Sequence, residues 1–181
     1  KRLIIDNVRI IGQKEVSANQ DYSGAKIDFS LPFNSGVNIL IADNLKGKSS
    51  IFKVIKYALT GSNSLKANIK KWIHHAFVNF SINDKNYTIY LDLSKRILSA
   101  YLFNGVISSV DELETYSNEI IFDANSETSF ENLINDFFFK QFTYYSLKWT
   151  QKSSQKDKDE LLQAGASWKT YFKSILLESK D

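Results

Sequence analysis

The sequence predicts an α/β fold with an antiparallel β-meander in its middle and helices towards its C-terminal end. Three observations support this prediction. An apolar, β-branched run at residues 37 to 42 is typical of a strand buried on both faces, and a helical pattern follows it. Three short alternating segments lie between residues 76 and 103. Aromatic residues then cluster at residues 137 to 145, which indicates a buried helix.

The chain begins with two predicted strands. The segment RLIIDNVRI, residues 2 to 10, alternates imperfectly, and a polar stretch that ends at Gly24 follows it. The segment AKIDFSL then precedes the only proline, Pro32. This pattern predicts a strand, a turn and a second strand ahead of the buried strand at residues 37 to 42.

A helix of about three turns is predicted from Ser49 to Gly61. Gly61 stands where a left-handed C-terminal cap is wanted. The apolar residues recur at helical spacing, which predicts one buried face. They are Phe52, Ile55, Tyr57, Ala58 and Leu59.

After a basic linker, the segments AFVNFSI, NYTIYLDL and ILSAYLF predict an antiparallel meander. Turn residues Asn83 to Lys85 separate the first two segments, and Asn104-Gly105 ends the third with a strong hairpin signal. Two further helices are predicted, at residues 129 to 147 and in the tail from Ser167, which is suited to an N-cap.

Composition limits the classes of protein that this chain can belong to. Its 181 residues are 43% hydrophobic, enough for the core of one domain or of one lobe of a larger one. The sequence has no cysteine, signal peptide or membrane-spanning apolar run, so we expect a cytoplasmic protein with no membrane partner. Because it also has no methionine, we expect a fragment of something longer.

The net charge of +3 hides an uneven distribution. Residues 46 to 96 hold ten Lys/Arg against two Asp/Glu, whereas residues 111 to 136 hold eight Asp/Glu and no Lys/Arg. Two solvated faces of opposite sign explain this pattern, and a basic side that faces phosphate or DNA is the alternative.

The stretch from Ala42 to Ser49 follows the predicted buried strand and opens the predicted helix. It matches the phosphate-loop pattern G-x-x-x-x-G-K-[ST] at every defined position except the first, where Ala42 replaces glycine. In such a loop the backbone N–H groups hold phosphate, the lysine reaches the β and γ phosphates, and the hydroxyl reaches Mg²⁺. Gly47 stands next to Lys48, where the backbone comes closest to phosphate. A chance Gly-Lys-Ser sequence in an ordinary strand-to-helix loop is the alternative.

With these motifs the sequence resembles the N-terminal lobe of the ATPase head in the SMC family and in its relative, the double-strand-break repair ATPase with a zinc-hook coiled coil. The matching residues are Ile5, Asn7, Val8, Arg9, Gly36, Asn38, Asn44, Gly47, Lys48, Ser49, Ser50 and the ALTG that closes the helix. The resemblance implies a P-loop NTPase lobe over residues 1–181. It divides into strands, phosphate loop and first helix (1–61), a β-meander (62–110), and a helical part with a Q-loop and the start of a coiled coil (111–181).

The resemblance also implies the ligands and their residues. ATP and Mg²⁺ are the cofactors, with Lys48 and Gln151 as catalytic residues and Ser49 and Gln151 at the metal. Gln151 is the first choice for the Q-loop glutamine and Gln155 the second. The residues implied to contact nucleotide are Arg9, Asp43, Asn44, Leu45, Lys46, Gly47, Lys48, Ser49 and Ser50.

The family's active site is composite, and this chain lacks its other half. No Ser-Gly-Gly signature occurs, and Asp123, the one acidic candidate after an apolar run, is followed by alanine rather than glutamate. We therefore interpret Asp123 as a decoy and expect the carboxylate pair in a C-terminal lobe. The implied partners are that lobe or a second head that dimerises on ATP, together with DNA and a nuclease or other effector.

The differences from the family pattern favour a divergent branch, such as an anti-phage or mobile-element ATPase. The alternative function is a non-catalytic interaction module with a degenerate phosphate loop. A small nucleotide kinase ranks below both, because a lid needs arginines and the chain has only Arg2, Arg9 and Arg96. His74 and His75 are adjacent in a predicted strand, so they point to opposite faces and are interpreted as structural rather than as a metal pair.

Overall fold

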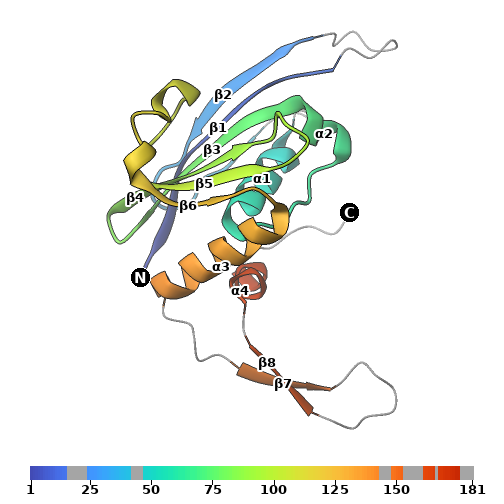
Figure 1. The fold of residues 1–181 in the computed structure, drawn as a ribbon, viewed down its shortest axis with the longest axis vertical. Helices are drawn as coiled ribbons and strands as arrows, with labels where there is room; N and C mark the ends of the chain where they lie inside the picture. The colour runs from blue at the N-terminus through green and yellow to red at the C-terminus, as the bar shows by residue number, and fades with distance from the viewer. Residues whose placement is uncertain (16–23, 42–46, 143–147, 153–160, 166, 176–181) are drawn as a thin grey trace.

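The computed structural model describes residues 1–15, 24–41, 47–142, 148–152, 161–165 and 167–175. Within these ranges the chain forms an α/β fold built on one six-stranded antiparallel sheet (Figure 1). The strands are β1 (Leu3–Gln13), β2 (Lys26–Pro32), β3 (Ile73–Ile82), β4 (Lys85–Asp92), β5 (Ser99–Asn104) and β6 (Ile120–Ala124). Their order across the sheet is β2-β1-β3-β4-β5-β6, so the strands predicted at the N-terminus and the predicted meander share one sheet.

One row of side chains shows how the register builds the core. Val8 lies opposite Val78, Val78 opposite Ile89, and Ile89 opposite Leu102, and all four are fully buried. The tight turn between β3 and β4 contains Asn83 and Asp84, both with positive φ, 47° and 66°. Such a turn matches the twist of the flanking strands, so the predicted turn at residues 83 to 85 is confirmed.

Three main helices lie on the inner side of this sheet within the described residues, and the last of them packs on the other two. They are α1 (Lys48–Thr60), α3 (Glu127–Phe142) and α4 (Trp168–Ile175), and each contributes residues to the core of the inner face. The short basic helix α2 (Ala67–Trp72) leads into β3. The predicted helices at residues 49 to 61 and 129 to 147 are confirmed within the described residues. The predicted N-cap at Ser167 is confirmed because its Oγ accepts a hydrogen bond from the Thr170 N–H at 3.1 Å.

The outer face of the sheet carries a smaller aromatic cluster beneath the segment that joins β5 to β6. Phe77, Tyr90 and Phe103 are buried there together with Ile107 from the joining segment. This segment contains two short 3₁₀ turns, η1 (Val110–Glu112) and η2 (Ser117–Glu119), before the chain returns as edge strand β6. The Asn104-Gly105 pair therefore ends a strand but does not form a two-residue hairpin.

The prediction of a buried strand at residues 37 to 42 is wrong for the part that the structure describes. Residues 37–41 form no strand, and Val37, Ile39 and Ile41 are 91%, 79% and 87% exposed. The alternate apolar residues are suited to a sheet, but no described strand pairs with them. Ala42 lies outside the described residues.

Three strands of the structure were not predicted from the sequence. β6 is an edge strand of five residues in the acidic region, and β7 (Lys148–Lys152) pairs with β8 (Leu161–Gly165) where a polar break was predicted. Strands of five residues carry little periodic signal. No helix among the described residues has both the length and the apolar character needed to cross a bilayer.

Gly61, the C-cap of helix α1, packs against Glu131 of helix α3 and provides a test of this packing. A Cβ added at Gly61 would lie 2.4 Å from Glu131 Cα, and φ is +70°. We expect Gly61→Ala to lower the free energy of unfolding by about 3 kcal/mol, because a left-handed conformation is strained and backbone must also move. Gly24→Ala is the matched control: φ is also +70°, but the nearest atom is the flexible Gln13 Nε2 at 3.4 Å. In urea titrations Gly24→Ala should lower the free energy of unfolding by only about 1 kcal/mol. Equal losses in the two variants would contradict the proposed clash.

Candidate functional site

The candidate site begins at Gly47, where helix α1 starts. Gly47 has φ 90°, and its carbonyl oxygen accepts hydrogen bonds from the N–H groups of Ser50 at 3.0 Å and Ile51 at 3.1 Å. A Cβ at Gly47 would meet no described atom within 4 Å. The positive φ therefore explains the glycine at this position.

The first turn of helix α1 is suited to an anion. Lys48, Ser49 and Ser50 form this turn, and it contains no acidic residue. N–H groups at the start of a helix point along its axis and carry partial positive charge, which favours phosphate. Within the described residues, the structure thus places Gly47, Lys48 and Ser49 of the predicted phosphate loop at the start of helix α1. Asp43, Asn44, Leu45 and Lys46 lie outside the described residues, so the predicted convergence of their amide groups stays a prediction.

Exposed apolar side chains flank this site on both sides in the sequence. Val37, Ile39 and Ile41 precede the loop, and Phe52, half exposed, follows it in the second turn of α1. We call these four residues the apolar margin of the site.

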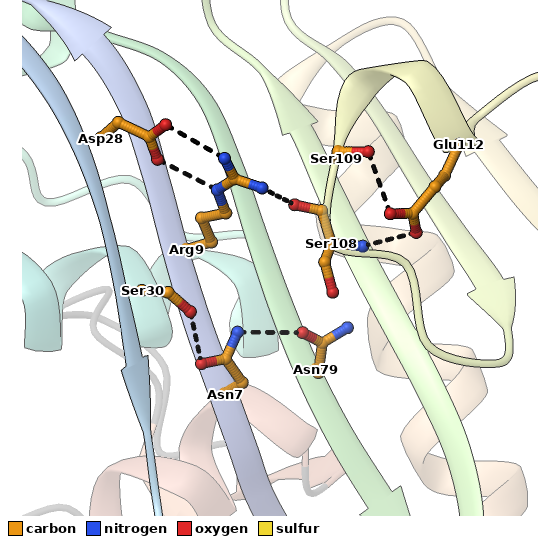
Figure 2. A network of polar contacts seen from close by, with 8 residues as sticks. All are labelled: Asn7, Arg9, Asp28, Ser30, Asn79, Ser108, Ser109 and Glu112. Atoms are coloured by element: carbon orange, nitrogen blue, oxygen red, sulfur yellow. Dashed lines mark hydrogen bonds and ion pairs between the residues drawn. The ribbon is translucent and has the colours of Figure 1, made fainter.

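Arg9, which the resemblance assigns to the nucleotide, lies on the outer face of the sheet in strand β1. Its Nε and Nη2 atoms donate to the two carboxylate oxygens of Asp28, both at 3.0 Å, and Nη1 donates to the Ser108 carbonyl at 2.8 Å (Figure 2). The hydrogen bond from Arg9 holds the pKa of Asp28 below its ordinary value. In this structure the guanidinium therefore joins β2 to the segment after β5, and its contact with nucleotide stays a prediction.

The same face carries a buried polar network that fixes the segment after β5. Asn79 Nδ2 donates to Thr88 Oγ1 at 2.8 Å and to the Ile107 carbonyl at 2.9 Å. The Thr88 hydroxyl donates to the Gly105 carbonyl at 2.8 Å. Asn7 lies beside Asn79 and connects it to β2 (Figure 2). Because its buried polar groups are paired, this network is suited to holding backbone in place.

The other predicted residues lie apart from Gly47 in the sequence and on other elements. Gln151 is in strand β7, which lies between helices α3 and α4 in the sequence, and it pairs with Leu162 of β8. Gln155 lies outside the described residues. Asp123 is exposed on edge strand β6, opposite Tyr101. The roles given to the two glutamines and to Asp123 therefore stay predictions.

The two histidines lie in strand β3. His75 Nδ1 is 2.9 Å from the Tyr90 hydroxyl, and burial lowers the pKa of His75 although Asp92 opposes that effect. Among the described residues, no group of three or more His, Cys, Asp or Glu side chains is arranged to hold a metal ion.

A polar pocket that the sequence analysis missed lies at the other end of α1. Its volume is about 430 Å³, and Glu127 on its wall accepts hydrogen bonds from Lys70 at 2.8 Å and Asn63 at 3.3 Å. The Tyr57 hydroxyl also donates to Glu127 at 3.4 Å. The contact with Lys70 is the main cause of the lowered pKa of Glu127. No sequence signal identifies this cluster, because its members are distant along the chain.

The lowered pKa of Glu127 predicts an acid-dependent loss of stability. The ionised carboxylate contributes fully above its ordinary pKa of 4.5, and the contribution disappears as the pH falls through the lower folded-state pKa. In urea titrations the free energy of unfolding of the unaltered chain should fall between pH 7 and pH 3. We expect this fall to be about 0.5 kcal/mol smaller in Glu127→Gln. Asp123→Asn controls for the change in charge. A variant with the same acid dependence as the unaltered chain would contradict the role of Glu127.

The exposure of the apolar margin predicts tolerance to charge. We expect Ile39→Lys to change the free energy of unfolding of the 181-residue chain by less than about 0.5 kcal/mol, because Ile39 is 79% exposed. Val78→Lys is the contrasting variant, since Val78 is fully buried in β3, and it should prevent folding. A loss of several kcal/mol in Ile39→Lys would show that this residue is buried after all.

Almost the whole chain matches one protein-family model. Residues 2–178 match the family model described as "AAA domain". No curated protein matches the chain significantly. The family match covers β1, the described part of the phosphate loop, and helices α1, α3 and α4 together.

Proposed function

Because this chain belongs to the AAA domain family of P-loop ATPases, we propose that it is the ATP-binding lobe of an SMC-like ATPase head. The family supports nucleotide binding and an ATPase-type function in general. The observation that carries the proposal is the left-handed Gly47 immediately before the first turn of α1, with Lys48 and Ser49 in that turn. Both the backbone conformation and the residue types are those that hold phosphate.

The residues at this helix end fit ATP and Mg²⁺. The N–H groups of the first turn provide donors, and Lys48 provides an ammonium group for the β and γ phosphates. Ser49 would hold Mg²⁺ through its hydroxyl, and the ion neutralises phosphate charge when it is bound. Asn44 and its neighbours would complete the loop. Because phosphoryl transfer depends mainly on positioning and charge neutralisation, these residues contribute binding.

The apolar margin supports a second lobe that completes the site. Val37, Ile39 and Ile41 have the alternate spacing of a strand, yet they are exposed beside the phosphate loop. A strand from another lobe or another chain would pair with this segment and remove it from water. We propose that this lobe supplies the catalytic carboxylates, and that Gln151 acts as the Q-loop residue in the completed site.

The proposed partners, cellular process and location of the protein rest on its resemblance to SMC-like heads. They are dimerisation on ATP, action on DNA in repair or in defence against mobile elements, a nuclease or other effector as partner, and a cytoplasmic location. The basic residues of helix α2 are weak support for DNA binding. Both of them are already paired, Lys70 with Glu127 and Lys71 with Glu15.

One observation favours the alternative function, a non-catalytic interaction module. Arg9 uses its Nε, Nη1 and Nη2 atoms on Asp28 and Ser108 rather than reaching outwards. A lobe that no longer binds nucleotide would keep these structural hydrogen bonds of Arg9, and it would tolerate alanine at position 42. The two functions differ in whether Mg-ATP binds at all.

Calorimetric titration with Mg-ATP separates the two functions. We expect the 181-residue chain to bind Mg-ATP weakly and Lys48→Ala to weaken the binding at least about ten-fold, because it removes the ammonium group beside the phosphates. Lys53→Ala removes the same charge from the same helix, one turn beyond the site, and should leave the affinity nearly unchanged. No heat with any of the three proteins would favour the interaction module.

Turnover provides a second readout of the same proposal. The chain alone should hydrolyse ATP poorly, because the proposed carboxylates lie in another lobe. Substantial hydrolysis by the chain alone that is abolished by Asp123→Ala would refute the composite site.

A further inference from the structure

Trp168, the first residue of helix α4, caps the far end of the phosphate-loop helix. Its indole Nε1–H donates to the Leu59 carbonyl oxygen at 2.7 Å, and the side chain is only 2% exposed. Leu59 lies in the last turn of α1, where carbonyl groups have no donor within the helix. Helix α4 therefore supplies a donor that helix α1 cannot supply for itself.

The two ends of α1 thus serve two different contacts. Gly47 and the first turn form the candidate phosphate site, and Leu59 receives Trp168 one residue before the helix ends at Thr60. The helix has 13 residues, which corresponds to a rod of about 20 Å. Val54, Tyr57 and Ala58 are fully buried along it, so the rod is held against the sheet and is expected to move as one piece.

Helix α4 is also held on α3, which fixes the position of Trp168. The indole stacks on Phe138 with ring centroids 4.4 Å apart and on Phe142 at 5.5 Å. Beside it, Lys169 Nζ contacts Glu131 Oε1 at 2.8 Å. Figure 1 shows α4 beneath α3. A shift of α1 along its axis must therefore either carry α4 with it or lengthen the Trp168 hydrogen bond.

We propose that Trp168 couples occupancy of the phosphate site to the docking of helix α4. This inference rests on the proposed function, because it takes the ligand of that site to be Mg-ATP. The Trp168 hydrogen bond fixes α1 and thereby holds its first turn in the position that binds phosphate. Bound nucleotide fixes α1 in return and strengthens the docking of α4, because coupling between two binding events is reciprocal.

Trp168→Phe tests the coupling, because it keeps an aromatic ring and removes only the N–H donor. We expect it to weaken Mg-ATP binding about five-fold, the effect of one buried neutral hydrogen bond. We also expect Mg-ATP to slow amide exchange in residues 168 to 175 of the unaltered chain and to have little effect there in Trp168→Phe. Lys169→Gln is the matched control: it removes a contact between α4 and α3, leaves Leu59 capped, and should keep the affinity.

A merely structural role gives a different result. If Trp168→Phe speeds amide exchange in α4 but binds Mg-ATP as tightly as the unaltered chain, the coupling is overturned and the proposed function stands. If the unaltered chain does not bind Mg-ATP, the proposed function fails and the coupling fails with it.

A second measurement leaves Trp168 in place, in case its replacement prevents folding. The chain has three tryptophans, so Trp72→Phe combined with Trp149→Phe leaves Trp168 as the sole indole. Its fluorescence should change during a titration with Mg-ATP, at the concentrations at which calorimetry detects binding. An emission spectrum that stays constant while calorimetry records binding would overturn the coupling.

Discussion

The burial of helix α1 against the six-stranded sheet is the constraint on which the rest of the structure depends. Val54, Tyr57, Ala58 and Leu59 are fully buried, and burial of each large apolar side chain contributes about 1.5–3 kcal/mol. Glycines in the left-handed region bound the helix at both ends, Gly47 before it and Gly61 after it. The buried face fixes the rotation of the helix, and the two glycines fix where it starts and stops. The direction of its first-turn N–H groups follows from both.

Most of the fold could be predicted from the sequence because its long elements have strong periodic patterns. The pattern of Phe52 to Leu59 predicted helix α1, and Gly61 adopts the left-handed conformation that a C-terminal cap requires. The three alternating segments became β3, β4 and β5, and Asn83 and Asp84 have the positive φ angles of a tight turn. In each case local chemistry and tertiary packing favour the same structure.

The remaining parts depend on contacts that a single segment does not reveal. The apolar alternation of Val37 to Ile41 predicted a buried strand, but burial needs a neighbour, and the described chain provides none. Strand β6 pairs with β5 through only a few residues, and its sequence gives little sign of that pairing. The candidate site is similar. Gly47, Lys48 and Ser49 could be identified from local sequence, whereas the pairing of Arg9 with Asp28 depends on the register of β1 with β2.

The pairing of Arg9 has a consequence for any anion that reaches the outer face of the sheet. The guanidinium already shares its charge with Asp28 through two hydrogen bonds. An incoming anion must therefore displace the Asp28 carboxylate. The free energy of its binding is then only the difference between the two ionic contacts. Asp28 therefore limits what Arg9 can contribute to any anion site on this face.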